Sequence, residues 1–205
     1  MTQYEQFLTP ENFKLAFVRL KTSSRNLYKT IYYEDLRIFG LYLDENIEST
    51  INQVKNEIYK PEKSHKIFIP KKDNLVRPLS ILTFIDLLIY QAMTNVIADN
   101  SYDVIAPYYD NLIFGNIVNP STANVLDREF FFKSWKRKWK RFNEVSKENF
   151  ENGYKYLSEF DIASFFDTID HNILCEILAN TFKIEANILE LLSKCLETWT
   201  ADSNH

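Results

Sequence analysis

Apolar residues recur at intervals of three and four along most of this chain, a spacing that places them on one face of a helix. Helices are therefore predicted to follow the Thr9-Pro10 cap and to cover residues 44–59, 83–98 and 185–199. The apolar stripes of the first three comprise Phe13, Ala16, Phe17 and Leu20; Ile47, Ile51, Val54 and Ile58; and Ile85, Leu88, Ile89, Ala92, Met93, Val96 and Ile97. This pattern predicts a largely helical chain.

Two stretches between these helices have β character. Residues 66–70 and 76–81 are predicted as strands joined by a polar turn, and a proline at each margin indicates an edge hairpin. A further short strand is predicted to end at Asp161, ahead of a helix capped by Asp170. The predicted fold class is therefore α+β, in which a mostly helical body carries a small antiparallel β-hairpin.

Composition narrows the classes of protein further. The 205 residues are 45% hydrophobic and 15% aromatic, which is enough for a substantial core in one domain or in one domain and part of another. No run approaches the ~18 apolar residues of a membrane span, and the first residues lack a secretory signal pattern, so we expect a cytoplasmic protein with no membrane partner. Cys175 and Cys195 occupy apolar helix positions and are expected to be buried and reduced. Only three glycines are present and no glycine-rich loop, which excludes P-loop and dinucleotide-binding enzymes.

The charge of the chain is unevenly distributed. The net charge of −4 alone argues against a nucleic-acid binder, yet residues 131–141 hold six basic residues and no acid. This segment is predicted to be helical, with residues 143–153 as a polar connector after it. One of its faces is aromatic, formed by Phe132, Trp135, Trp139 and Phe142. Two interpretations stay open: contact with the backbone of a nucleic acid, or tryptophans in the core beneath a solvated charged face.

The most informative segment is residues 156–171, which read Tyr-Leu-Ser-Glu-Phe-Asp-Ile-Ala-Ser-Phe-Phe-Asp-Thr-Ile-Asp-His. A strand would deliver the carboxylate of Asp161, small residues would follow it, and two adjacent aromatic rings would come next. Such an arrangement suits a metal ion, a phosphate chain and a sugar packed against an aromatic wall. The segment resembles motif A of the reverse-transcriptase palm, whose aspartate binds catalytic magnesium.

Upstream segments resemble the same family in the same order. Residues 67–81 and the helix at 84–92 are similar to the fingers signature of bacterial and group II intron reverse transcriptases. Residues 114–116, Phe-Gly-Asn, are similar to the short element that often comes next. Three matching segments over residues 65–175 are more specific than the D-x-x-x-F-F pattern alone. The helical leader and the long insert before motif A look more like defence-associated, abortive-infection-type bacterial enzymes than like retroviral ones.

The resemblance implies a role for each matching residue. Asp161, with the carbonyl of Ile162 beside it, would bind Mg²⁺ or Mn²⁺. The residues that would surround the nucleotide are Lys71, Arg77, Ala163, Ser164, Phe165 and Phe166. Among these, Arg77 and Lys71 would meet the triphosphate. Phe166 would lie under the sugar and exclude a 2′-hydroxyl, while Phe165 packs inward.

Each of these residues also has a structural explanation. Asp161 could cap a turn at a strand end, the two phenylalanines could both be core, and Lys71 could belong to a solvated turn. Asp86 and Gln91 match the fingers helix, but a helix cap and a polar helix face explain them almost as well.

The resemblance is incomplete, because the 205 residues contain no Y-x-D-D segment, no glycine-rich motif before it and no thumb. After Asp170 the only aspartate is Asp202, and one carboxylate cannot hold two metal ions. We therefore expect the N-terminal part of a longer or split enzyme that is inactive alone. The alternative is a non-catalytic nucleic-acid-binding or scaffold module with an inert palm remnant.

The expected organisation follows from this comparison. Residues 1–43 would form a helical N-terminal extension, 44–152 the fingers with the basic helix, and 153–205 a partial palm carrying motif A, in a truncated right-hand polymerase fold. The expected partners are an RNA template, a DNA or RNA primer, dNTPs, and the missing palm and thumb on the same or another chain.

Overall fold

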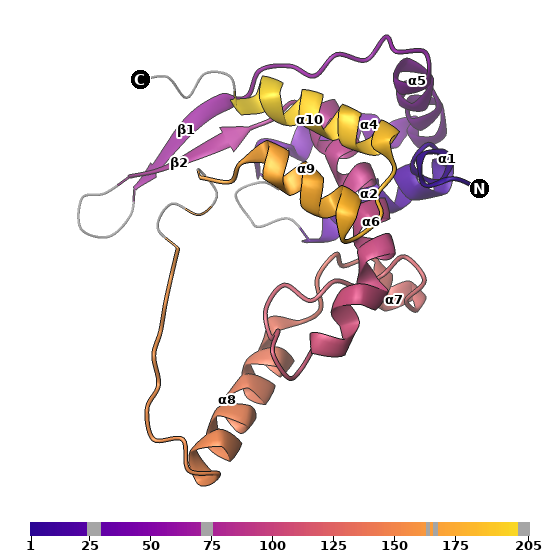
Figure 1. The fold of residues 1–205 in the computed structure, drawn as a ribbon. Helices are drawn as coiled ribbons and strands as arrows, with labels where there is room; N and C mark the ends of the chain where they lie inside the picture. Colours follow the sequence, from indigo (N-terminus) through magenta and orange to yellow (C-terminus); the bar gives the residue numbers. More distant parts are fainter. Residues whose placement is uncertain (24–29, 71–75, 163–164, 166–167, 201–205) are drawn as a thin grey trace.

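The computed structural model describes residues 1–23, 30–70, 76–162, 165 and 168–200, and Figure 1 traces their course. The helices are α1 (Gln3–Phe7), α2 (Pro10–Ser23), α4 (Tyr33–Leu41), α5 (Leu43–Lys55), α6 (Phe84–Ile105), α7 (Val125–Arg128), α8 (Trp135–Glu151), α9 (His171–Asn180) and α10 (Ala186–Thr200), with a 3-10 turn η2 (Ala106–Tyr108). The strands are β1 (His65–Pro70) and β2 (Val76–Ile81). The predicted α+β class is confirmed: a mostly helical body carries one antiparallel hairpin.

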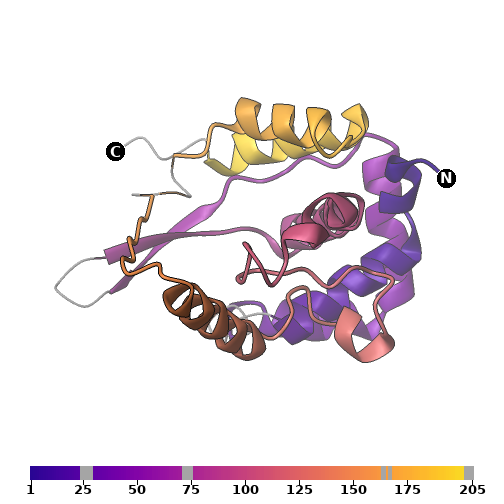
Figure 2. The same ribbon diagram turned by 60° about the horizontal axis from the view of Figure 1, so that its bottom comes forward.

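Helix α6 forms the centre of the body, and Figure 2 shows it nearly end-on with the other helices around it. It contacts α1, α2 and α10, and its buried residues include Leu88, Met93 and Val96. A helix that is apolar on several faces is stable only when neighbours cover those faces. Phe13 and Ile188 join the same core, so all three predicted domain ranges contribute to one core. The boundaries between those ranges stay a prediction.

The ends of α5 and α6 differ from the prediction. The α5 helix stops at Lys55, because Glu57 adopts a left-handed φ of 58° and the Ile58 amide donates to the Gln53 carbonyl at 2.9 Å. Ile58 is consequently 65% exposed, and its assignment to the apolar stripe was wrong. The α6 helix begins where predicted, with Thr83 as its N-cap, but continues to Ile105, beyond the predicted end.

The final helix, α10, buries the centre of its apolar face. Ile188, Leu192, Cys195 and Trp199 are each at most 5% exposed, and α10 contacts α1, α6 and α9. Glu185 ties its start to the N-terminus, since its two carboxylate oxygens accept from the amides of Gln3 and Tyr4, each at 3.0 Å. Other helices of the same chain therefore cover most of this apolar face.

The segment between α8 and α9 contains the main correction to the predicted fold. Helix α8 continues to Glu151, where residues 143–153 were predicted to be a connector, and the ion pair of Lys147 with Glu151 at 3.6 Å lies in its last turn. Residues 154–162 then run as an extended, exposed chain (Figure 1). The predicted strand ending at Asp161 is not formed, because no described segment lies beside it to complete a ladder.

Candidate nucleotide and nucleic-acid interface

Asp161 lies in this extended segment with its carboxylate exposed to solvent. It makes no hydrogen bond or ion pair with any other residue that the structure describes, and the neighbouring Ile162 is 64% exposed. A free carboxylate beside a backbone carbonyl offers the hard oxygen ligands that Mg²⁺ prefers. Among the described residues, no group of three or more His, Cys, Asp or Glu side chains gathers around a common point. Asp161 thus fits as one ligand of a metal and not as a complete site.

The residues after Asp161 are only partly described. Ala163, Ser164 and Phe166 lie outside the described residues, as does Lys71 on the hairpin turn. Phe165 is 46% exposed, so the expectation that it packs inward was wrong; the strand that would have directed its ring to a core is not formed.

The α9 helix begins as predicted. One carboxylate oxygen of Asp170 accepts from the amides of Asn172 at 2.8 Å and Ile173 at 3.2 Å. This is the bonding pattern of an N-cap residue, so the Asp170 side chain stabilises the start of the helix. The carboxylate of Asp161 accepts no such hydrogen bond from the described residues.

Arg77 lies on β2 opposite Ile69, with its side chain exposed. Figures 1 and 2 both show the hairpin and the segment that carries Asp161 on the same side of the helical body. Arg77 and Asp161 do not contact each other in the structure. Both side chains are exposed.

Asp86 has an interior structural role that differs from the predicted cap, whereas Gln91 is only partly buried, as a polar helix face predicts. Asp86 is 1% exposed and accepts from the Tyr59 hydroxyl and, at 3.1 Å, from the Glu62 amide. Cys195 Sγ lies 3.8 Å from the same hydroxyl. Burial raises the pKa of Tyr59, and it raises that of the Cys195 thiol to about 11. Gln91 donates to the side-chain oxygen of Asn95 at 2.9 Å.

The predicted state of the cysteines is confirmed at Cys195, which is free and buried, whereas the free Cys175 is only partly buried. None of the helices in the described part of the chain combines the length and apolarity needed to cross a membrane.

Arg19 is the interior residue that sequence analysis missed. Its guanidinium is 1% exposed and donates at 2.8 Å to each of three acceptors: the Asn95 side chain and the carbonyls of Asn119 and Arg128. It also lies 5.1 Å from the centre of the Phe131 ring. Burial lowers its pKa to about 10. Its position on the Ala16–Leu20 side of α2 was a signal of burial, but the three acceptors are distant in sequence. Arg19 thereby ties α2 and α6 to the segment that leads into α8.

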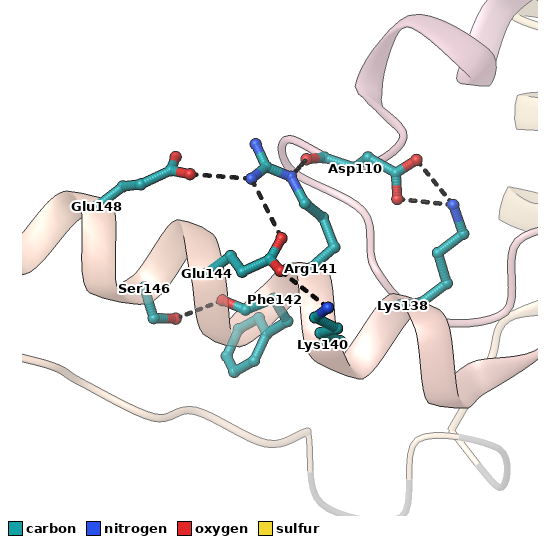
Figure 3. A network of polar contacts seen from close by, with 8 residues as sticks. All are labelled: Asp110, Lys138, Lys140, Arg141, Phe142, Glu144, Ser146 and Glu148. Carbon is teal, nitrogen blue, oxygen red and sulfur yellow. Dashed lines mark hydrogen bonds and ion pairs between the residues drawn. The ribbon is translucent and has the colours of Figure 1, made fainter.

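Helix α8 extends away from the body (Figure 1), and its tryptophans are not core residues. Trp135 is 69% exposed and Trp139 is 59% exposed, so the interpretation that buried them was wrong. Its charges are partly neutralised, as Figure 3 shows. Lys138 Nζ lies 2.7 Å from both carboxylate oxygens of Asp110, and Arg141 pairs with Glu148 at 3.0 Å.

Comparison with known proteins agrees with the resemblance found in the sequence. No profile of a known protein family matches the chain. The chain is similar to the group II intron-encoded protein LtrA of Lactococcus lactis subsp. cremoris, with 26% identity over 195 residues. The protein of the same name from strain MG1363 matches equally. The similarity supports a distant relationship to the reverse-transcriptase family. It covers 95% of this chain, whereas the chain spans about 28% of the length of LtrA.

Proposed function

We propose that this chain is the N-terminal part of an RNA-directed DNA polymerase that adds dNTPs to a primer, in a bacterial mobile-element or defence context. The observation that carries the proposal is the similarity to a group II intron-encoded protein along 95% of the chain. The ordered segments within residues 65–175 resemble the fingers and motif A of the same kind of enzyme. We assign residues 44–152 to the fingers and 153–205 to the start of the palm.

In this proposal Asp161 and the Ile162 carbonyl hold a divalent cation, Mg²⁺ or Mn²⁺. Cations bound in a complete site would activate the primer 3′-hydroxyl and neutralise the leaving pyrophosphate. Arg77 supplies a planar fork of donors to the triphosphate, and Lys71 adds a point charge on the same hairpin. The exposed position of Arg77 and the free carboxylate of Asp161 support these roles.

The sugar-binding part of the proposal rests on the resemblance of residues 161–166 to motif A. On that resemblance Ala163 and Ser164 would leave room beside the nucleotide, Phe165 would flank it, and the ring of Phe166 would exclude a 2′-hydroxyl. The second carboxylate pair comes from polypeptide outside these 205 residues, on the same or another chain. The 205-residue chain therefore binds nucleic acid and does not extend a primer by itself.

The test is Asp161→Asn in a protein or complex that supplies the Y-x-D-D segment. An amide keeps the shape but removes the charge, so incorporation of dNTPs on an RNA template should fall by at least ~100-fold, the scale of losing a catalytic electrostatic contact. Asp170→Asn is the matched control, because asparagine also caps helices and activity should persist. Normal extension by the Asp161 variant would overturn the assignment.

A second candidate function is a non-catalytic nucleic-acid-binding or scaffold module. The exposed aromatic and basic surface of α8 favours it, since that surface needs no active site. Under this alternative the chain binds nucleic acid, but no combination with a Y-x-D-D partner extends a primer.

A further inference from the structure

Helix α8 presents three rows of side chains, because residues three and four apart share one face. An aromatic row contains Trp135, Trp139, Phe142 and Phe150. A lysine row beside it contains Lys136, Lys140, Asn143 and Lys147. A charge-paired row contains Arg137, Arg141, Glu144 and Glu148. The basic residues of α8 therefore belong to surfaces of different character.

Arg141 of the charge-paired row and the adjacent Lys138 make contacts within the protein. Arg141 lies 3.0 Å from Glu148 and 3.8 Å from Glu144, and its Nε donates to the Asp110 carbonyl at 3.3 Å (Figure 3). The Lys138 side chain is only 18% exposed against Asp110. The contacts with Asp110 hold α8 to the body. Arg137 in the same row is exposed and has no ion pair with any described residue.

The lysine row is open to solvent. Lys136 has no ion pair with any described residue. Lys140 is 81% exposed with Glu144 at 3.9 Å, and Lys147 is 77% exposed with Glu151 at 3.6 Å. Exposed pairs at such separations are weak and screened by salt, so a polyanion can displace them.

The aromatic row is exposed and also braced. Trp139 stacks on Phe142 with ring centres 5.4 Å apart, and Phe142 meets Phe114 edge-on at 5.5 Å. The outer faces stay accessible, since Trp135 is 69% exposed and Trp139 is 59% exposed. Rings held in this way can accept a flat partner with little loss of side-chain freedom.

We propose that a single-stranded nucleic acid lies along α8, with bases stacked on Trp135 and Trp139 and phosphates on Lys136 and Lys140. A single strand offers unstacked base faces and a charged backbone together, the combination that aromatic and lysine rows side by side recognise. The base faces of a duplex are stacked inside it and cannot contact the tryptophans. An apolar protein surface would offer no negative charge to the lysine row. This inference rests on the proposed function in naming a nucleic-acid surface of the same chain, but it requires no catalysis.

The first test uses fluorescence of the full chain with Trp199→Phe, which removes the one buried tryptophan and leaves Trp135 and Trp139 as reporters. Titration with a 12-nucleotide oligothymidylate should quench the emission. A 12-base-pair duplex should bind more weakly and quench less. Binding of the single strand without quenching would overturn the stacking contact.

The second test separates the rows by substitution. Lys136→Gln with Lys140→Gln should flatten the slope of log affinity against log salt by about 1.4, since each phosphate contact of a single strand contributes about 0.7. Lys55→Gln with Lys60→Gln is the matched control, because both lysines are exposed on or just after α5, remote from α8 (Figure 1). Its slope should not change.

The third test replaces the rings. Trp135→Leu and Trp139→Leu keep apolar side chains but remove the stacking faces, and each should weaken oligothymidylate binding by roughly 5- to 150-fold. Phenylalanine at either position should restore much of the affinity. Affinity that is unchanged in the leucine variants would overturn the proposal, as would dimerisation of the chain through α8 that oligothymidylate fails to disrupt. Failure of the proposed polymerase function is distinguishable from failure of the α8 proposal. In that case Asp161→Asn would leave primer extension intact, whatever α8 binds.

Discussion

Lys138 on α8 and Asp110 in the turn after η2 form a two-pronged ion pair, with both carboxylate oxygens 2.7 Å from the ammonium nitrogen. This pair joins the protruding helix to the body. It matters because α8 has no fully buried side chain among its described residues. The direction of α8, and with it the placement of its aromatic and lysine rows, depends on the polar contacts of Asp110 and on the packing of Phe142 against Phe114.

Removing the charge of Asp110 should therefore loosen α8 without unfolding the body. Asp110 has a left-handed φ of 62°, which asparagine tolerates as well as aspartate does, so Asp110→Asn isolates the charge. We expect the free energy of local opening of α8 to fall by about 1 kcal/mol. Hydrogen exchange should accelerate in α8 and stay unchanged in α6. Equal protection of α8 in both proteins would show that the pair does not anchor the helix.

Arg19 should be among the most sensitive positions in the interior. Arg19→Met removes donors from three acceptors and should lower the free energy of unfolding by about 3–5 kcal/mol. Arg19→Lys keeps the charge but lacks the planar fork, so it should recover only part of the loss. Urea denaturation measures both variants. A lysine variant as stable as the natural protein would mean that charge alone matters there.

The bond from Tyr59 to Asp86 can be compared with a neutral bond of the same donor type. Tyr32 is also buried, and its hydroxyl donates to the Leu82 carbonyl at 2.7 Å. Tyr59→Phe should cost about 1.5–3 kcal/mol, because the lost acceptor is a carboxylate, and Tyr32→Phe about 1 kcal/mol. Thermal and urea denaturation test this order. The reverse order would indicate that Asp86 is satisfied without Tyr59.

The proposed sugar gate predicts a change of substrate choice. In a complete enzyme, Phe166→Ala should admit ribonucleotides by relieving a clash, with a modest loss of deoxynucleotide use. Phe165→Ala should leave the selectivity unchanged and, because Phe165 is 46% exposed, should alter stability by less than about 1 kcal/mol. Primer extension with matched rNTP and dNTP pairs gives the ratio. Selectivity lost at Phe165 and kept at Phe166 would exchange the two roles.

Most of the local elements could be predicted from sequence because their signals are local. The Thr83 and Asp170 caps begin α6 and α9 where expected, and the hairpin pairs His65–Pro70 with Val76–Ile81 within a residue of the prediction. The wrong end of α5 is also instructive. The apolar period continues through Ile58, but the backbone becomes left-handed at Glu57. The spacing of apolar residues does not predict that turn.

The sequence by itself determined the helical periodicity, the hairpin, the exclusion of glycine-loop enzymes and the resemblance of the segment around Asp161 to motif A. Only the tertiary structure decided that Arg19 is buried, that Trp135 and Trp139 are exposed, and that the chain before Asp161 has no strand beside it. Caps and turns involve neighbours a few residues apart, whereas burial and strand pairing depend on segments far away in the chain. A stripe of aromatic residues has the same period whether another segment covers it or solvent does.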